Sequence, residues 1–510
     1  MVIAMAITPP PARPDSVEQK ELLDKVRPPD EKHPQPKPVY DLAVVGAGPA
    51  GLAAVDSATA LGLSVALIER NRLGGNSLNA GSIPSKAIIG TARVFAAMCG
   101  AEEFGALSPA EPRADFGAVM NRMKRIRARI AEYHSAHRLR AAGVDIFFGD
   151  ARFMRSNVLA VDKTRLTFKK ALIATGARSY PCDIPGLEAI GYQTSETIFD
   201  LTALPRRLAV IGGGPLGCEL AQAFCRLGSH VNLIQNNPKF LPDEERDAAE
   251  LLSWALSRDG VETRLNTTVT GARMENGVKW LDTVSNEIKC YLEADEILLS
   301  IGRIPNVESL CLEKASIAFA PGRGITVDDF LRTTNPLVYA AGDVCMDRKF
   351  TNAAEASARM AVRNAFTGRR KRRSHLMIPW CTFCDPEIAH IGMHVREARE
   401  KGIPVKTFTV MMGDVDRAIV DGQDDGFVKI HVKEGTDTIL GATIVASRAS
   451  EMINEMSVVM SAGMGMRALA NVLHTYPAQS EAIRLAALAC ARDQAGRDVI
   501  FPPINGGQEQ

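Results

Sequence analysis

The sequence lacks a surplus of charge of either sign. Sixty Lys and Arg residues stand against 59 Asp and Glu, which leaves a net charge of +1 over 510 residues. A protein that binds nucleic acid neutralises phosphates with an excess of basic side chains, so this balance argues against a nucleic-acid partner. Cysteine is also scarce, at 10 residues with irregular spacing. Secreted domains held together by disulfides contain far more cysteine, so the composition favours reduced thiols and a cytoplasmic protein.

A long uninterrupted hydrophobic run is missing as well. The most apolar long stretch, residues 42–68, is broken by glycine, proline and an acidic residue, a pattern typical of strand–turn–helix–strand and not of a bilayer-spanning helix. We therefore expect no membrane partner. Residues 1–38 contain many prolines and charged residues and no secretory signal, which predicts a flexible N-terminal arm with at most one short helical turn at 17–26. The length suffices for about two to four domains.

Two segments share one internal pattern, which runs from an apolar strand through a G-x-G-x-x-G turn and a helix to a second apolar strand. The glycines are Gly46, Gly48 and Gly51 in the first segment and Gly212, Gly214 and Gly217 in the second. In such a βαβ unit the first glycine permits a tight turn, the second lets the backbone approach a pyrophosphate, and the third lets the helix pack closely. The phosphates then lie at the helix N-terminus. Two copies predict two dinucleotide sites.

The residue after the second strand distinguishes the two units. At equal distances from the first glycine stand Glu69 and Gln235. A carboxylate at this position accepts hydrogen bonds from the ribose hydroxyls of an adenosine. Gln235 keeps a hydrogen-bonding group without the charge that would repel a 2′-phosphate, and no Arg stands beside it to bind one. The second nucleotide therefore stays open between NADH and NADPH.

Further apolar segments end in turns that suit a flavoprotein of several domains. They are residues 171–176, 298–303 and 338–343, and the last ends in Asp343, an acid suited to a polyhydroxyl chain such as ribityl. The basic run 369–373 is interpreted as a solvated linker. Beyond it the pattern changes to strands, expected at 405–410, 426–432 and 438–445, followed by helices.

With these motifs the sequence resembles the pyridine nucleotide–disulfide oxidoreductases, which include lipoamide dehydrogenase, glutathione reductase and, nearest in texture, mercuric reductase-like enzymes. The matching motifs are both dinucleotide turns, segment 74–86, Thr175–Gly176, Gly342–Asp343, residues 385–387 and residues 476–481. The resemblance implies an α/β fold with two Rossmann-like dinucleotide-binding domains, for FAD and NAD(P)H, plus an α+β C-terminal dimerisation domain. It also implies a homodimer in which the partner's C-terminal segment completes each flavin site.

The resemblance also implies domain limits and cofactor contacts. The expected domains are an arm at 1–38, an FAD-binding domain at 39–190 and 326–373, an NAD(P)H-binding domain at 191–325, a dimerisation domain at 374–495 and a tail at 496–510. The residues implied for FAD are Gly46, Gly48, Pro49, Ala50, Gly51, Glu69, Arg70, Gly75, Ser77, Lys86, Ala151, Thr175, Gly176, Arg303, Gly342, Asp343, Phe350 and Thr351. Those implied for NAD(P)H are Gly212, Gly214, Gly217, Glu219, Gln235 and Gly302. No metal site is expected.

The redox-active disulfide of this family is missing. Where relatives read G-G-x-C-x-N-x-G-C-x-P-S-K, this chain has Ser77 and Ser82 at the two cysteine positions. A hydroxyl cannot form a disulfide and is a far weaker acid than a thiol, so neither position can supply a thiolate. The C-terminal tail contains no cysteine pair either. Because Hg(II) needs soft thiolate ligands, we do not expect mercury reduction.

The resemblance implies catalytic roles for four residues. Lys86 lies near flavin N5, and Glu219 pairs with it beside the nicotinamide, where positive charge favours electron gain by the flavin. Tyr476 occupies the position of an acid–base His in most of the family, and Glu481 is retained. The nearby His474 is interpreted as a structural residue.

Cys381 and Cys384 have the C-x-x-C spacing of a redox pair. The resemblance places them at the start of the C-terminal domain, away from the flavin, on a strand that would point the thiols to opposite faces. We interpret them as structural cysteines. Cys218 and Cys345 are interpreted as packing residues.

Three functions remain open. The first is an FAD-dependent NAD(P)H oxidoreductase that passes electrons directly to a small acceptor such as a quinone, dioxygen or a second nicotinamide. The second is a double Cys→Ser variant of a dithiol enzyme related to mercuric reductase or lipoamide dehydrogenase. Tyr476 and the cysteine-free tail argue against it, because they depart from the family pattern independently of the two serines. The third is a non-catalytic flavin-binding or sensing protein, which the retained Lys86 and Glu219 disfavour. We favour the first.

Overall fold

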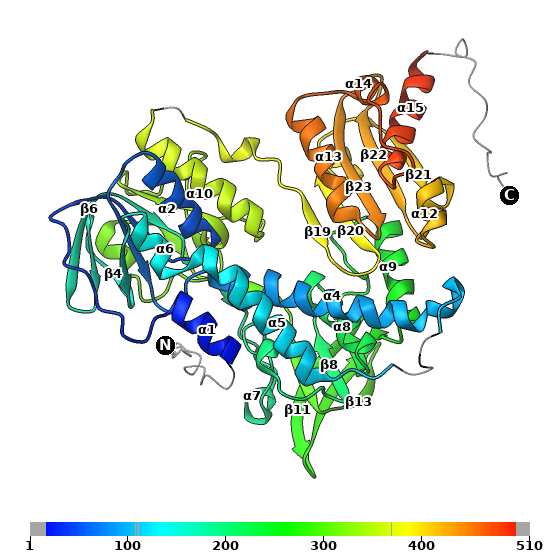
Figure 1. Ribbon diagram of the computed structural model, residues 1–510, viewed down its shortest axis with the longest axis horizontal. Coiled ribbons are helices and arrows are strands. Elements are labelled where there is room, and N and C mark those ends of the chain that lie inside the picture. The colour runs from blue at the N-terminus through cyan, green and yellow to red at the C-terminus, as the bar shows by residue number, and fades with distance from the viewer. Residues whose placement is uncertain (1–16, 108, 110–111, 369, 496–510) are drawn as a thin grey trace.

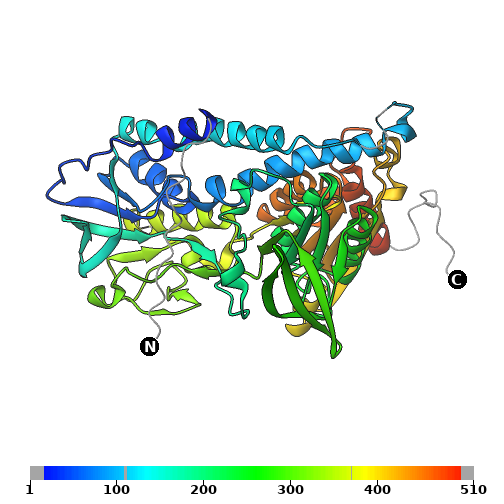
Figure 2. The same cartoon turned by 90° about the horizontal axis from the view of Figure 1, so that it is seen from below.

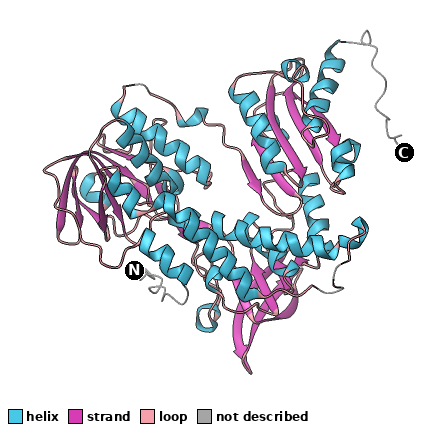
Figure 3. Ribbon diagram, in the orientation of Figure 1, coloured by secondary structure: helices cyan, strands magenta, loops and turns pink. Residues whose placement is uncertain are grey.

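The computed structural model describes residues 17–107, 109, 112–368 and 370–495. It contains three domains, each built on its own sheet with helices packed against it (Figure 3). The predicted α/β class with an α+β C-terminal domain is confirmed. Among the described residues, no helix is both long and apolar enough to cross a bilayer.

The first domain has a mainly parallel central sheet. Its strands are β1 (Tyr40–Val45), β2 (Val65–Glu69), β3 (Asp145–Phe148), β4 (Ala151–Arg155), β5 (Val158–Val161), β6 (Thr164–Ile173) and β18 (Val338–Ala340). The order is β3-β2-β1-β6, with β18 on β6 and with β5 and β4 continuing as an antiparallel meander. Helices α2 (Pro49–Ala60) and α10 (Thr351–Phe366) lie side by side against this sheet (Figure 1). Strand β18 thus returns to the sheet of the first domain, within the segment 326–373 that was expected to belong to it.

The second domain repeats the βαβ arrangement. Its parallel sheet has the order β10-β9-β8-β14, with β8 (Arg207–Ile211), β9 (His230–Ile234), β10 (Glu262–Arg264) and β14 (Glu296–Leu299). Helix α8 (Pro215–Arg226) follows β8, and α9 (Arg246–Arg258) precedes β10. An antiparallel sheet of β11 (Thr267–Glu275), β12 (Val278–Ser285) and β13 (Ile288–Ala294) completes the domain. Strands β7 (Ala177–Ser179) and β15 (Arg303–Pro305) pair where the chain passes between the first two domains.

The C-terminal domain is a five-stranded antiparallel sheet covered by helices. Its order is β19-β20-β23-β22-β21, with β19 (Trp380–Thr382), β20 (Glu387–Gly392), β21 (Val405–Met411), β22 (Phe427–Lys433) and β23 (Ile439–Ala446). Helix α13 (Ala449–Ser461) packs on β20 and β23, and α15 (Glu481–Ala495) packs on β21 and β22. The shorter helices are α11 (Val395–Glu400), α12 (Asp416–Val420) and α14 (Met466–Ala470). The three strands expected from the sequence correspond to β21, β22 and β23.

Two long helices connect the first domain to the second. After the short α3 (Gly75–Asn79), α4 (Ser82–Cys99) and α5 (Phe116–Ile130) run side by side toward α8 (Figures 1 and 2). A shared apolar core contains Ile88 of α4, Met123 of α5 and Phe224 of α8. The same core extends to Ile388 of the C-terminal domain, so all three domains meet beside α4 and α8.

The predicted flexible arm is wrong for residues 17–38. Helix α1 (Val17–Val26) buries Leu22 and Val26 in the core of the first domain. Farther along, a guanidinium nitrogen of Arg27 donates to the carbonyl of Arg70 at 3.2 Å, and the His33 ring bonds the carbonyl of Phe148 at 2.7 Å. This segment is therefore part of the folded domain, whereas residues 1–16 lie outside the described structure.

Packing also places two predicted domain limits differently. Residues 307–325 were assigned to the second domain, yet Leu310, Leu312 and Ile317 are buried in the core of the first. Conversely, α7 (Leu187–Ile190) was assigned to the first domain, and Leu187 packs with the core of the second. The chain thus leaves the first domain before residue 187 and re-enters it before residue 310.

Candidate functional site

The first glycine-rich turn has the close backbone contacts that a dinucleotide fold requires. Gly46 has φ +101°, and a Cβ there would lie 2.4 Å from the carbonyl oxygen of Ala174. A Cβ on Gly51 would lie 1.8 Å from the oxygen of Gly46, so only glycine lets α2 pack this closely on β1. Gly75 lies against Gly48, because a Cβ on Gly75 would be 2.5 Å from the Gly48 Cα. Segment 74–86 therefore lies in contact with the first glycine-rich turn. This contact is needed if one cofactor is to bind to the segment and the turn together.

The second turn has the same geometry. Gly212 has φ +110°, and its Cβ would lie 2.3 Å from the oxygen of Ser300. A Cβ on Gly217 would lie 2.1 Å from the oxygen of Gly212, which repeats the close packing of helix on strand. No atom lies within 4 Å of a Cβ built on Gly214, so this position is open for a phosphate group at the N-terminus of α8.

Glu69 and Gln235 occupy equivalent places at the ends of β2 and β9. The Glu69 carboxylate accepts from the N–H of Ala47 at 2.8 Å and from that of Asn71 at 2.7 Å. Burial raises the pKa of Glu69, and these two backbone donors oppose the shift. Gln235 accepts from the N–H of Gly213 at 3.2 Å. A carboxylate accepts more than two hydrogen bonds, so Glu69 retains capacity for the ribose hydroxyls of FAD.

The two serines that stand where the resemblance leads one to expect cysteines lie around one threonine. Thr351, the first residue of α10, donates its hydroxyl hydrogen to Ser77 Oγ at 3.3 Å, and its oxygen lies 3.5 Å from Ser82 Oγ. The structure therefore brings Thr351 to the two serines, although about 270 residues separate it from them in sequence. Their side chains supply hydroxyl groups only, so this cluster can donate and accept hydrogen bonds but cannot exchange disulfides.

Lys86 and Glu219 form an ion pair across the first two domains. The Lys86 Nζ lies 2.7 Å from Glu219 Oε2. The Glu219 side chain is only 3% exposed, whereas Lys86 is 32% exposed. Lys86 lies one helical turn after Ser82 on α4, so the ammonium group and the hydroxyl cluster share one face of this helix.

The C-x-x-C segment, which was expected away from the flavin and on a strand, lies against this ion pair, with Cys381 in β19 and Cys384 in the turn that follows. Between its two cysteines, Phe383 donates its backbone N–H to Glu219 Oε1 at 2.9 Å. Burial raises the pKa of the Cys381 and Cys384 thiols well above the ordinary range, and nearby carboxylates add to the shift for both. Such thiols stay protonated at neutral pH, which agrees with a structural role.

The other residues that the resemblance implies for FAD have partners of their own or lie in the loops of the first domain. The Arg303 guanidinium pairs with Asp343 at 2.9 Å, and Thr175 donates its hydroxyl hydrogen to the carbonyl of Asn306 at 2.7 Å. Phe350 precedes α10 and stacks on Trp380 with ring centroids 6.4 Å apart. The remaining predicted positions fall on the first domain at the glycine-rich turn, after β2, at the start of β4, in the turn after β6 and in the turn after β18: Pro49, Ala50, Arg70, Ala151, Gly176 and Gly342. Gly302, expected at NAD(P)H, follows β14.

Tyr476 and Glu481 lie on the C-terminal domain and have partners of their own there. Tyr476 donates its hydroxyl hydrogen to Asp416 Oδ2 at 2.7 Å, while Glu481 pairs with Arg484. The hydrogen bond to Asp416 raises the pKa of Tyr476. His474 is held by Glu455 at 2.7 Å, as expected for a structural histidine. Tyr476 is 70% exposed on the surface of this single chain.

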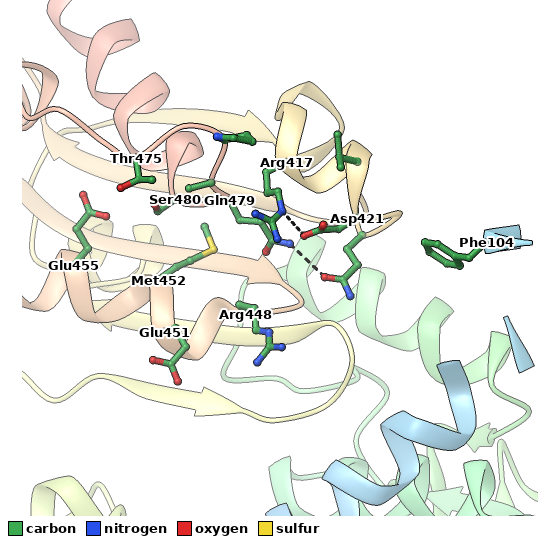
Figure 4. Close-up of a pocket in the computed structure, with 14 residues that line it drawn as sticks. Phe104, Arg417, Asp421, Arg448, Glu451, Met452, Glu455, Thr475, Gln479 and Ser480 are labelled. Atoms are coloured by element: carbon green, nitrogen blue, oxygen red, sulfur yellow. Dashed lines mark hydrogen bonds and ion pairs between the residues drawn. The ribbon is translucent and has the colours of Figure 1, made fainter. Parts of the chain in front are cut away.

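A cavity of about 870 Å³ lies beside Tyr476. Figure 4 shows its lining, which includes Arg417 of α12 paired with Asp421 just after that helix, and Glu451 and Glu455 of α13. Residues 477–480 form another wall, and Phe104, which follows α4, borders the cavity. The cavity thus belongs to the face of the C-terminal domain that carries Tyr476, and not to the Lys86–Glu219 pair.

Sequence reasoning missed the residues that hold the ion pair in place. Phe383 contacts both of its members, and Gln222 on α8 bonds the backbone of Asp385. The sequence did carry a signal for Gln222: it stands three residues after Glu219, and residues three apart on a helix lie on the same face. For Phe383 no local signal exists, since its partner lies 164 residues away.

Comparison with known proteins covers most of the chain. Residues 40–364 match the family described as pyridine nucleotide-disulphide oxidoreductase, and residues 378–487 match the dimerisation domain of that family. A mercuric reductase of Bacillus cereus is 30% identical over 454 residues, which cover 89% of this chain and 72% of that protein. A dihydrolipoyl dehydrogenase of Geobacillus stearothermophilus is 31% identical over 449 residues, which cover 86% of this chain and 93% of that protein. The Cu(II) complex of the HOCl-induced flavoprotein disulfide reductase RclA from Escherichia coli has a TM-score of 0.77 at 29% identity, covering 87% of this chain and 98% of its own.

Proposed function

Because the chain belongs to the pyridine nucleotide-disulphide oxidoreductase family, we propose that it transfers electrons from NADH or NADPH through FAD to a small acceptor without a redox-active disulfide. The family uses FAD and NAD(P)H, and the chain is an oxidoreductase. The observation that carries the disulfide-free part is the intact Lys86–Glu219 pair beside a cluster of hydroxyl groups.

The residues of the chain bind and orient the reactants. Gly48 and Gly75 let the backbone approach the FAD pyrophosphate, and Glu69 holds the ribose. Gly214 and Gln235 do the same for the nicotinamide nucleotide. Bound FAD supplies the two-electron carrier between the nicotinamide and the acceptor.

Lys86 supplies the charge that the reaction needs. Its ammonium group places a positive charge where negative charge develops as electrons arrive, and a preorganised charge of this kind lowers the barrier. Glu219 fixes the direction of that ammonium group, since its Oε2 lies 2.7 Å from Lys86 Nζ. Glu219 itself is buried, so water does not compete for this contact.

The acceptor is proposed to be a small oxidant such as a quinone, dioxygen or a second nicotinamide. Ser77 and Ser82 cannot form the mixed disulfide that a disulfide substrate needs, nor can they bind a soft metal ion. The buried thiols of Cys381 and Cys384 carry raised pKa values, which opposes a relay through them. Free cysteines throughout the described chain support a reducing compartment such as the cytoplasm.

We also propose a homodimer in which Tyr476 and Glu481 face the flavin site of the partner subunit. The family's dimerisation domain occupies residues 378–487, and Tyr476 projects from it with a largely exposed ring. The phenol donates its hydrogen to Asp416, so it could present this proton to an acceptor in the partner's site only by exchanging that hydrogen bond. Light scattering that finds a stable monomer at micromolar concentration would contradict this arrangement.

An anaerobic titration of the FAD-loaded protein with NADH, and separately with NADPH, tests the proposed function. We expect loss of flavin absorbance with one equivalent of the preferred nucleotide, followed by recovery when a quinone or air is added. A protein that binds FAD but is reduced by neither nucleotide would support the non-catalytic alternative. Reduction without reoxidation by any small acceptor would refute the proposed acceptor class.

A further inference from the structure

The turn formed by Phe383, Cys384 and Asp385 joins β19 to β20 in the C-terminal domain. It lies against α8, the helix that carries Glu219. On that helix Glu219, Gln222 and Arg226 are three and four residues apart, so their side chains lie on one face. This face is directed at the turn.

Each of the three α8 side chains bonds the turn. Phe383 N–H donates to Glu219 Oε1 at 2.9 Å. Gln222 donates its amide hydrogen to the carbonyl of Asp385 and accepts from the N–H of Asp385, both at 2.8 Å. Arg226 pairs with Asp385 Oδ2 at 2.8 Å. The turn is thus fixed to α8 through two backbone N–H groups, one carbonyl and one carboxylate.

Helix α4, which carries Lys86, holds the same turn from the other side. Two turns after Lys86, Arg93 donates to the carbonyl of Cys384 at 3.2 Å and pairs with Glu387 at 2.8 Å. The second oxygen of the buried Glu387 accepts from the N–H of Ser450 at 2.8 Å. The turn is therefore held between the two helices that supply the ion pair.

The turn also contacts both members of the ion pair directly. Lys86 Nζ lies 4.4 Å from the centre of the Phe383 ring, within the range of a cation–π interaction. Glu219 is 3% exposed, and a buried carboxylate is costly unless its oxygens are hydrogen-bonded. Lys86 occupies Oε2 and Phe383 occupies Oε1. Without the turn, Oε1 would lose this donor, and the carboxylate would be less constrained.

We propose that the Phe383–Asp385 turn is a positioning element of the NAD(P)H site, which holds the Glu219 carboxylate so that Lys86 stays directed at the site of hydride transfer. This inference rests on the proposed function. Phe383 and Gln222 act through Glu219 and are positioning residues. The C-terminal domain therefore serves its own chain's nicotinamide site, in addition to dimerisation.

A double-mutant cycle tests whether Gln222 acts through Glu219. Gln222→Leu removes both bonds to the Asp385 backbone and a third to Asp259 Oδ2 within the second domain, without touching Lys86. We expect the limiting rate of flavin reduction to fall about tenfold. The affinity for NAD+, measured by equilibrium titration, should change less than twofold. In a Glu219→Gln background, Gln222→Leu should have no further effect, because non-additivity identifies residues that act as a unit. Fully additive losses would overturn the proposal.

Arg258→Gln is the matched control. The exposed Arg258 also links the second domain to the C-terminal domain, through Asp425 at 2.8 Å, but it contacts neither α4 nor the turn. We expect its limiting rate to equal that of the unmodified protein. A loss equal to that of Gln222→Leu would show that any interdomain contact matters, and would refute a specific role of the turn.

Hydrogen–deuterium exchange gives a readout that needs no turnover. In Glu219→Ala the amide of Phe383 loses its acceptor, and in Gln222→Leu the amide of Asp385 does, so each should exchange at least tenfold faster within segment 381–387. Arg258→Gln should leave both unchanged. Unaltered exchange in both variants, with folding verified by thermal melting, would overturn the proposal. This outcome is distinct from failure of the proposed function, which would appear as flavin that neither nucleotide reduces.

Discussion

Lys86 and Glu219 are 133 residues apart in the chain, yet the ammonium nitrogen of one lies 2.7 Å from the carboxylate oxygen of the other. Each lies on a helix of a different domain, Lys86 on α4 and Glu219 on α8. The ion pair therefore joins the first domain to the second, and the proposed function places the flavin and the nicotinamide beside it. Its geometry gives the first prediction.

Replacing Lys86 with Met should slow flavin reduction by NAD(P)H by a factor of about 10² to 10³, the usual loss when one preorganised electrostatic group is removed. Met keeps most of the side-chain volume and removes the charge. Stopped-flow absorbance under anaerobic conditions measures the rate. The control is Lys169→Met, which removes an exposed lysine paired with Asp41 on the first domain. Equal rates for Lys86→Met and the unmodified protein would exclude a role for this charge.

Replacing Glu69 with Ala should weaken FAD retention. Hydrogen bonds to a charged acceptor contribute about 1.5–3 kcal/mol each, so the loss of one ribose bond alone corresponds to roughly 10-fold to 100-fold in affinity. Fluorescence titration of the apoprotein with FAD measures this change. Glu69→Gln, which keeps an acceptor for the N–H of Ala47, should retain FAD better than Glu69→Ala. Full retention by Glu69→Ala would contradict the assignment of the first dinucleotide site.

Acid should destabilise the protein below about pH 6.5, because of a buried histidine at the junction of the second and C-terminal domains. Burial, followed by the charge of the stacked His394, holds the pKa of His390 well below its ordinary range. The unfolded chain takes up a proton near pH 6.5 while folded His390 stays neutral, so the unfolding free energy falls as the pH drops. One such group contributes up to about 1.4 kcal/mol per pH unit.

Urea midpoints measured at pH 7.5, 6.5 and 5.5 test this dependence. His390→Gln should flatten the decline between pH 6.5 and 5.5, whereas a substitution of the exposed His230 should not. A midpoint that is constant over this range in the unmodified protein would count against the assignment. Among the neighbouring carboxyl groups, the lowered pKa of Glu245 adds to acid sensitivity only at still lower pH, whereas burial raises the pKa of Glu244 and works in the opposite direction.

The βαβ units could be predicted from sequence because their signals are local. Glu69, placed by its distance from the first glycine, is the last residue of β2. The first and third glycines of each unit are required by contacts with their own turn or the end of the adjoining strand, so spacing alone identifies them. The Lys86–Glu219 pair followed from a resemblance between motifs, and the structure then brought both residues together.

The rest could not be predicted because it depends on tertiary packing. A helical turn was expected at 17–26, where α1 lies, but its burial was not, because a helix of ten residues is held in place mainly by tertiary contacts such as those of Leu22 and Val26. The contact between Phe383 and Glu219 spans 164 residues. The packing of residues 307–325 in the first domain likewise has no local signal, because their apolar side chains would suit either core.

The missing thiols give the last prediction. In a dithiol relative the first two electrons reduce the disulfide, and a thiolate beside oxidised flavin gives a long-wavelength absorbance. Ser77 and Ser82 supply no thiolate, so two electrons should bleach the flavin with no such band. Lipoamide, glutathione disulfide and Hg(II) should not be turned over. Anaerobic spectra and steady-state assays measure both outcomes.

The double variant Ser77→Cys/Ser82→Cys provides the matched comparison. Both hydroxyls lie within 3.5 Å of Thr351 Oγ1, so sulfur atoms at these positions would lie near each other. We expect this variant to gain the long-wavelength band on two-electron reduction, whereas Ser77→Cys alone should form no intrachain disulfide. A band in the unmodified protein, or rapid turnover of a disulfide substrate, would show that another pair such as Cys381 and Cys384 acts as the relay. That result would contradict the disulfide-free mechanism. We do not expect it, because the raised pKa values of the Cys381 and Cys384 thiols oppose thiolate formation at neutral pH.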